Sequence, residues 1–150
     1  MLDLLRGHIL PAAYAVLPER MESPEATHLL LAIAMQESGL AHRRQIGGPA
    51  RGLWQFERVG VLGVVMHHSS AKPAAMACDR LLYPVPDVDA IYRAIEHNDV
   101  LACVFARLLL WTDPHPLPAD PDSGWDLYLR AWRPGKPRIE HWPASWQNAA

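Results

Sequence analysis

The feature that most constrains this chain is an apolar run over residues 29–35 that leads into an acid. The run is Leu-Leu-Leu-Ala-Ile-Ala-Met, and Gln-Glu-Ser-Gly follows it. A helix with this sequence is apolar on nearly every side, so it belongs in the centre of a protein. Glu37 continues the apolar stripe, because Ile33 and Leu30 precede it by about one and two helical turns. A buried carboxylate is unfavourable unless it is paired, neutral or used in chemistry.

The ends of this central helix are marked by local signals. Ser23 is a good capping residue, and Pro24 suits the first position of a helix. Gly39 is a typical residue at which a helix stops. The sequence therefore predicts a helix over residues 24–38, with Glu37 in its last turn.

A second central helix is predicted over residues 100–111, where Arg107 is the only charged residue and Asn98 or Asp99 provides the cap. Weaker helical patterns surround these two, and strand signals are weak. The weaker patterns cover residues 2–17, 54–68, 73–83, 87–95 and 123–132, with chain breaks at Pro84 and Pro86 and a final segment held by Trp142 and Trp146. We expect one all-α domain over residues 1–150, with six to nine helices around two buried central helices.

Composition limits the possible functions. The chain has 150 residues, half of them hydrophobic, and a net charge of −2, so nothing in it requires nucleic acid as a partner. No apolar stretch approaches the roughly 20 residues that span a bilayer, and the N-terminus is a poor signal peptide. Cys78 and Cys103 are too few for a disulfide framework, although one bond between them stays open. We expect a monomer without a metal or cofactor.

Two interpretations of Glu37 follow from the residues alone. Apolar neighbours raise the pKa of a carboxyl, and a carboxyl protonated near neutral pH can donate a proton to a glycosidic oxygen. Alternatively, Glu37 forms a salt bridge with an arginine of the following loop, which would lower its pKa. The candidate partners are Arg43, Arg44 and Arg51. With His42, the same arginines could instead hold carboxylates of a substrate.

Three short motifs resemble those of the lytic transglycosylase and goose-type lysozyme superfamily. Residues 35–40 are Met-Gln-Glu-Ser-Gly-Leu, and residues 52–55 are Gly-Leu-Trp-Gln where the family has Gly-Leu-Met-Gln. The third motif is weaker, because residues 131–135 are Ala-Trp-Arg-Pro-Gly where the family has Ala-Tyr-Asn-x-Gly. The composition also resembles that of small bacteriophage proteins with a lysozyme-like domain.

The resemblance implies a role for each matched residue. Glu37 would be the general acid and then the base, and Ser38 would position the N-acetyl group of the sugar. Gln55 and the turn of Gly52, Leu53 and Trp54 would contact the glycan, with the Trp54 ring either stacked on a sugar or packed in the core. The family tyrosine that bonds the acid is absent, and Tyr128 could take its place from the same helix face. Arg133 could instead form an ion pair with Glu37, which would lower its pKa and weaken catalysis. Tyr128, Trp132 and Arg133 are also expected to contact the substrate.

The same resemblance implies peptidoglycan as the substrate. No second acid lies between Glu37 and Gln55, which favours a lytic transglycosylase that cleaves the MurNAc–GlcNAc β-1,4 bond and leaves a 1,6-anhydro product. A hydrolysing muramidase is the alternative, with Glu57 as the nearest later acid. A non-catalytic glycan-binding or phage structural protein is a further alternative. We expect synthesis in the cytoplasm and action on the cell wall, through a phage virion or host lysis.

Overall fold

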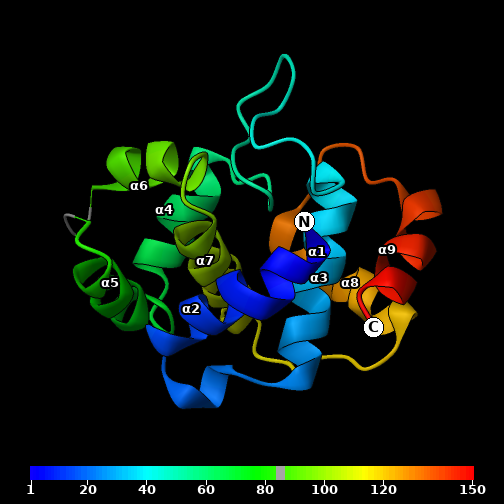
Figure 1. Ribbon diagram of the computed structural model, residues 1–150, viewed down its shortest axis with the longest axis horizontal. Helices are drawn as coiled ribbons and strands as arrows, with labels where there is room; N and C mark the ends of the chain where they lie inside the picture. Colours follow the sequence, from blue (N-terminus) through cyan, green and yellow to red (C-terminus); the bar gives the residue numbers. More distant parts are fainter. Residues whose placement is uncertain (84–86) are drawn as a thin grey trace.

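Two apolar helices, α3 (Pro24–Ser38) and α7 (Asp99–Trp111), form the centre of the protein (Figure 1). The structure is a computed structural model that describes residues 1–83 and 87–150. Residues 29–34 of α3 and 101–106 of α7 have no exposed surface. Both central helices were predicted from their lack of a polar face, and the all-α fold class is confirmed.

The ends of α3 follow the local signals of the sequence. Ser23 Oγ accepts a hydrogen bond from the Ala26 N–H at 3.1 Å, and Pro24 is the first helical residue. Gly39 adopts the left-handed conformation, with a φ of +58°, and its N–H bonds to the Met35 carbonyl. Glu37 therefore lies in the last turn of α3, where the buried helix meets the surface.

The other helices pack around this centre. In Figure 1, α4, α5 and α6 lie on one side of the central pair, and α8 and α9 lie on the other. Within the described residues there is no strand, only isolated bridges between Arg44 and Arg51 and between Arg51 and Phe56. The breaks predicted at Pro84 and Pro86 lie outside the described residues. The remaining elements are α1 (Leu2–Leu4), η1 (Leu5–Ile9), α2 (Leu10–Ala15), η2 (Glu19–Met21), α4 (Arg58–Met66), α5 (Ala71–Arg80), α6 (Val88–Ile95), α8 (Pro121–Trp132), η3 (Ile139–His141) and α9 (Trp142–Asn148).

Two predicted helix starts were wrong. α4 begins at Arg58 rather than at residue 54, because residues 52–55 form a tight turn closed by paired backbone hydrogen bonds between Arg51 and Phe56. α8 begins earlier than predicted, because Asp120 rather than Ser123 is its cap. The Asp120 carboxylate accepts a hydrogen bond from the Ser123 N–H at 2.9 Å, and Pro121 occupies the first helical position.

An aromatic cluster holds the C-terminal segment against the body, as the sequence predicted. Trp142 is 2% exposed, and its ring centroid lies 5.6 Å from that of Trp125 and 5.7 Å from that of Tyr128. Its indole N–H donates to the Pro121 carbonyl at 2.7 Å. Trp146 lies 5.7 Å from Trp142 and packs beside Gly124. The cluster joins α8 and α9 into one layer that covers α3.

Both cysteines are buried free thiols, which closes the question of a disulfide. Burial raises the pKa of Cys78 to about 11, and it raises that of Cys103 further above its usual range. Neither thiol therefore has the thiolate character that reactive cysteines need. No helix in the described part of the chain is long and apolar enough to cross a membrane.

We predict that Gly124→Ala destabilises the protein, because an added Cβ would lie 2.3 Å from the Trp146 ring. Overpacking of this kind lowers the free energy of unfolding by roughly 1–3 kcal/mol. Gly63→Ala in α4 is the matched control, since an added Cβ there meets nothing within 4 Å and alanine is the better helix former. Urea unfolding of both variants measures the difference. Equal stability of the two variants would contradict this description of the α8–α9 contact.

Candidate functional site

A cleft of about 1390 Å³ opens beside the C-terminal end of α3. Its walls come from that end of α3, the loop after it, the start of α4, the end of α8 and the segment that follows α8. The predicted site residues that line it are Glu37, Ser38, Gln55, Tyr128, Trp132 and Arg133. Three separate stretches of sequence therefore meet at one surface.

Glu37 and Tyr128 form the central contact of the cleft. The phenol of Tyr128 donates a hydrogen bond to Glu37 Oε1 at 2.6 Å, so α8 is joined to the end of α3. Tyr128 is only 2% exposed, whereas Glu37 is partly buried and lines the cleft. The sequence left open whether Tyr128 or Arg133 lies against the acid, and the structure places Tyr128 there.

The surroundings of Glu37 favour its protonated form. Burial raises its pKa to about 7, and the negative charge of Glu57 acts in the same direction. The hydrogen bond from Tyr128 and the positive charge of Arg138 oppose this rise without cancelling it. Burial, followed by the charge of Glu37, holds the pKa of Tyr128 well above its usual range, so the phenol remains a donor. A carboxyl with such a pKa can both give and take a proton near neutral pH.

The predicted alternative, a salt bridge from Glu37 to a loop arginine, is wrong. Arg43 pairs with Asp99 at 2.9 Å, and Arg51 pairs with Glu96. Arg44 comes no closer than 4.0 Å to Glu96. Within residues 1–83 and 87–150, Glu37 takes part in no ion pair.

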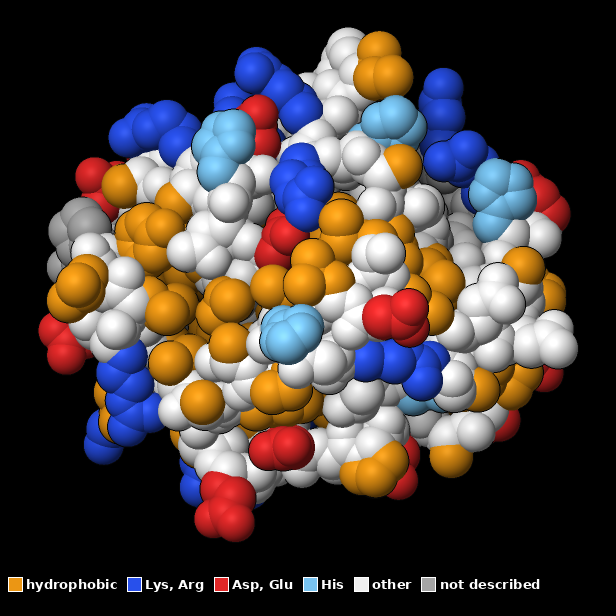
Figure 2. All heavy atoms as spheres, in the orientation of Figure 1, with side chains coloured by type: hydrophobic (Ala, Val, Ile, Leu, Met, Phe, Trp, Pro, Cys, Tyr) orange, Lys and Arg blue, Asp and Glu red, His pale blue; other side chains and the backbone are white. Residues whose placement is uncertain are grey.

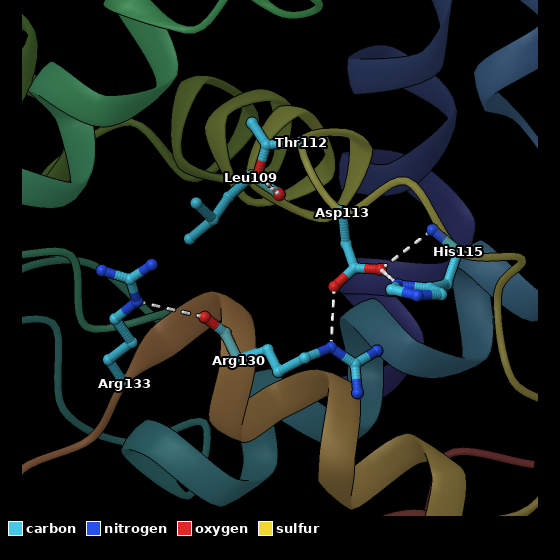
Figure 3. A network of polar contacts seen from close by, with 6 residues as sticks. All are labelled: Leu109, Thr112, Asp113, His115, Arg130 and Arg133. Atoms are coloured by element: carbon cyan, nitrogen blue, oxygen red, sulfur yellow. Dashed lines mark hydrogen bonds and ion pairs between the residues drawn. The ribbon is translucent and has the colours of Figure 1, made fainter.

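Arg133 likewise forms no ion pair with Glu37. Its Nε donates to the Arg130 carbonyl at 3.3 Å (Figure 3). Arg133 has a φ of +50°, which ends α8 in the left-handed conformation. The side chain nevertheless lines the cleft, so it remains a candidate contact for a bound molecule.

Ser38 uses its hydroxyl within the protein. Its Oγ donates to the Ala34 carbonyl at 2.9 Å and accepts from the Leu40 N–H at 3.2 Å. These bonds cap the end of α3 and set the direction of the following loop. Ser38 therefore acts on the site by holding the helix end that carries Glu37.

The turn formed by Gly52, Leu53 and Trp54 does not line the cleft, which corrects the predicted glycan contact. Leu53 and Trp54 have no exposed surface, and Gly52 is buried against Ile95. The Trp54 indole N–H donates to the Leu30 carbonyl at 2.8 Å, so the ring fills the core and its one polar group is satisfied. Of the two interpretations of Trp54, core packing is correct.

Gln55 lines the cleft from the end of this turn, and Trp132 lines it from the end of α8. Gln55 has a φ of +48°, and its amide donates to the Gly52 carbonyl at 2.8 Å and to the His42 carbonyl at 3.3 Å. Trp132 donates its indole N–H to the Trp54 carbonyl at 2.9 Å and leaves part of its surface exposed. A partly exposed indole fixed in this way offers a flat apolar surface to a ligand.

Gln36 was not assigned to the site from the sequence, and Glu57 was considered only as the second acid of a hydrolase. Glu57 is exposed in the cleft, and its side chain makes no capping hydrogen bond although it precedes α4. Gln36 is buried and donates its amide to the Arg138 carbonyl at 2.8 Å. A polar residue inside an otherwise apolar helix was the available signal for Gln36.

A network around Asp113 fixes the end of the cleft near α8 (Figure 3). Asp113 accepts hydrogen bonds from Arg130 Nε at 2.9 Å, from the His115 N–H at 3.0 Å and from His115 Nδ1 at 2.7 Å. Although burial opposes ionisation, these hydrogen bonds hold the pKa of Asp113 at about 2. The loop after α7 is thereby tied to α8, and Arg130 is occupied by a carboxylate.

The described residues contain no group of three or more His, Cys, Asp or Glu side chains placed to hold a metal ion. Comparison with family models, with curated proteins and with solved structures finds no match for this chain.

We predict that Glu37→Gln stabilises the protein above neutral pH. The folded-state pKa of about 7 exceeds the ordinary value of 4.5, so the stability of the wild type falls as pH rises from 4.5 through 7. Glutamine accepts the Tyr128 hydrogen bond without this penalty. The gain should reach roughly 1–3 kcal/mol near pH 8 and vanish near pH 4. Urea unfolding at both pH values checks this, and a destabilised variant near pH 8 would contradict the raised pKa.

Proposed function

We propose that this protein is a peptidoglycan lytic transglycosylase that cleaves the MurNAc–GlcNAc β-1,4 bond. The observation that carries the proposal is the Glu37 carboxyl, which is raised in pKa to about 7, bonded to Tyr128 and set in the wall of a large cleft. The cleft exceeds the roughly 300–1,000 Å³ of most small-molecule pockets, which suits a polymer. The motif resemblance supplies the choice of a peptidoglycan strand.

In the proposed mechanism Glu37 first acts as the acid. It donates its proton to the glycosidic oxygen as the bond from that oxygen to C1 of MurNAc breaks. The N-acetyl carbonyl of the sugar stabilises the positive charge that develops at C1. Tyr128 stays bonded to Glu37 Oε1, which leaves Oε2 to carry the proton.

Glu37 then acts as the base. Its carboxylate removes the proton from the 6-hydroxyl of the same MurNAc, and the 6-oxygen attacks C1 to form the 1,6-anhydro ring. The proton from the 6-hydroxyl replaces the one that left with GlcNAc, so Glu37 is protonated again and no water is consumed. A single carboxyl with a pKa near 7 suits both steps.

One observation favours hydrolysis as a second candidate. Glu57 is an exposed carboxylate in the same cleft, it forms no ion pair in the described part of the chain, and its charge acts on Glu37. A second carboxylate could activate a water molecule, as in the two-acid glycosidases. The product would then be a reducing MurNAc end.

The proposed substrate lies in the cell wall. We propose that the protein is made in the cytoplasm and reaches the wall through a phage virion or through host lysis. This route is an extension of the resemblance to small phage proteins with lysozyme-like domains.

We expect Glu37→Gln to lower the rate of turbidity loss of purified sacculi by about 100-fold or more, because it removes the proton donor. Glu19→Gln, an exposed substitution outside the cleft, should retain activity.

Wild-type activity should fall as pH rises through about 7, since the acid ionises. Tyr128→Phe should move this fall to higher pH. The hydrogen bond from Tyr128 lowers the pKa of Glu37, so its loss raises that pKa. Equal turbidity loss by wild type and Glu37→Gln, or none by either, would refute an enzymatic role.

The products distinguish the two candidate reactions. Mass spectrometry of the released fragments should show MurNAc ends that are one water lighter than reducing ends. Reducing ends, together with a rate that falls about 100-fold in Glu57→Gln, would establish the muramidase instead.

A further inference from the structure

Positive charge gathers at the cleft although the chain as a whole is slightly acidic. The chain has 14 Lys and Arg residues against 16 Asp and Glu residues. Among the described cleft residues, only Glu37 and Glu57 are acidic. The basic ones are Arg44, Arg130, Arg133, Lys136 and Arg138. Figure 2 shows Lys and Arg side chains along the upper edge of the molecule, where the loop after α3 projects in Figure 1.

Most of these cations lack a close carboxylate. Arg130 is held by Asp113 at 2.9 Å (Figure 3), and Arg44 lies 4.0 Å from Glu96. The basic residues of the segment after α8, namely Arg133, Lys136 and Arg138, form no ion pair within the described ranges. Their charge is therefore available to a bound molecule.

The segment that carries these cations is anchored to the helix of the acid. Gln36, next to Glu37, donates its amide to the Arg138 carbonyl at 2.8 Å, and Ser145 Oγ donates to Gln36 Oε1 at 3.3 Å. Gln36 is 7% exposed, so this link is shielded from water. The positive charge of Arg138 also lowers the pKa values of Glu37 and Tyr128, which places the guanidinium near the reacting end of the cleft.

We infer that the cleft selects acidic glycan strands by binding their carboxylates, with Lys136 and Arg138 on one wall and Arg44 on the other. This inference rests on the proposed function and names its substrate class. Lactyl and stem-peptide carboxylates recur along a peptidoglycan strand, and guanidinium groups bind carboxylates in a planar, two-point geometry. A neutral chitin-like chain offers the same sugar backbone without these groups. The acids Glu37 and Glu57 in the same cleft disfavour the closely spaced phosphates of a nucleic acid, which favours a sugar chain.

The test measures binding rather than cleavage, with the full chain carrying Glu37→Gln. The probes are isolated glycan strands with their stem peptides, and the same strands after carbodiimide coupling to ammonia, which converts carboxylates to neutral amides. Native strands should bind at low ionic strength and weaken towards about 0.15 M salt. Amidated strands should bind about tenfold more weakly, with little dependence on salt.

Charge-removing variants locate the contacts. Lys136→Gln, Arg138→Gln and Arg44→Gln, each added to Glu37→Gln, should weaken binding of native strands by about two- to fivefold. Binding of amidated strands should not change. Lys72→Gln, an exposed substitution on α5 outside the cleft, is the matched control and should change neither. Circular dichroism verifies that each variant is folded. The comparison of native with amidated strands needs no substitution of Lys136, Arg138 or Arg44, so it tests the inference even if a variant fails to fold.

Each outcome decides the inference. Equal affinity for native and amidated strands would overturn it, even if wild-type protein cleaves sacculi through Glu37. Displacement of the strands by single-stranded DNA of equal charge at equal concentration would also overturn it, because the cleft would then respond to charge alone. Charge-dependent strand binding by a protein that cleaves nothing would support the inference and refute the proposed enzyme.

Discussion

The complete burial of residues 29–34 in α3 is the constraint on which the rest of the structure depends. A helix that is apolar on every side needs cover on every side, and α7, α9 and the turn around Trp54 supply it. On the C-terminal side the cover ends in the last turn of α3, where Gly39 turns the chain away and the cleft begins. Glu37 lies at this boundary, so it is shielded enough for its pKa to rise and open enough to meet a ligand. The demand for a core thus also determines where the acid stands.

The protonation of Glu37 reflects a balance of opposing effects. Burial raises its pKa most strongly. The hydrogen bond from Tyr128 and the positive charge of Arg138 lower the pKa, but they offset only part of that rise. The folded-state pKa of about 7 lies above the ordinary value of 4.5. Ionisation of Glu37 therefore lowers the free energy of unfolding by roughly 3 kcal/mol. Such a penalty in the last turn of a central helix has no benefit for stability. It is therefore better explained by a use for the proton than by packing, as raised carboxyl pKa values often are.

Features that depend on neighbours along the chain could be predicted from the sequence. Ser23, Pro24 and Gly39 define both ends of α3. Asp120 with Pro121 repeats the same capping pattern at α8, although the predicted cap is Ser123. Features that depend on packing could not be predicted in this way. Trp54 suits a sugar face as well as a core, and only the Leu30 carbonyl that its N–H meets decides between them. Proximity in sequence suggested Arg43 as a partner of Glu37. In the structure Arg43 instead pairs with Asp99, which lies 56 positions away in sequence.

Gln36 and Glu37 show how one helix end can serve two walls of a cleft. Successive side chains on a helix point about 100° apart, so Glu37 faces the cleft while Gln36 faces the segment that follows α8. By binding the Arg138 carbonyl, Gln36 fixes that segment relative to the acid. Cations on a free loop would lose conformational entropy when they bound a strand, whereas anchored cations lose less. The buried amide beside the acid is thus the physical link between the group proposed to cleave the glycan and the charges proposed to select it.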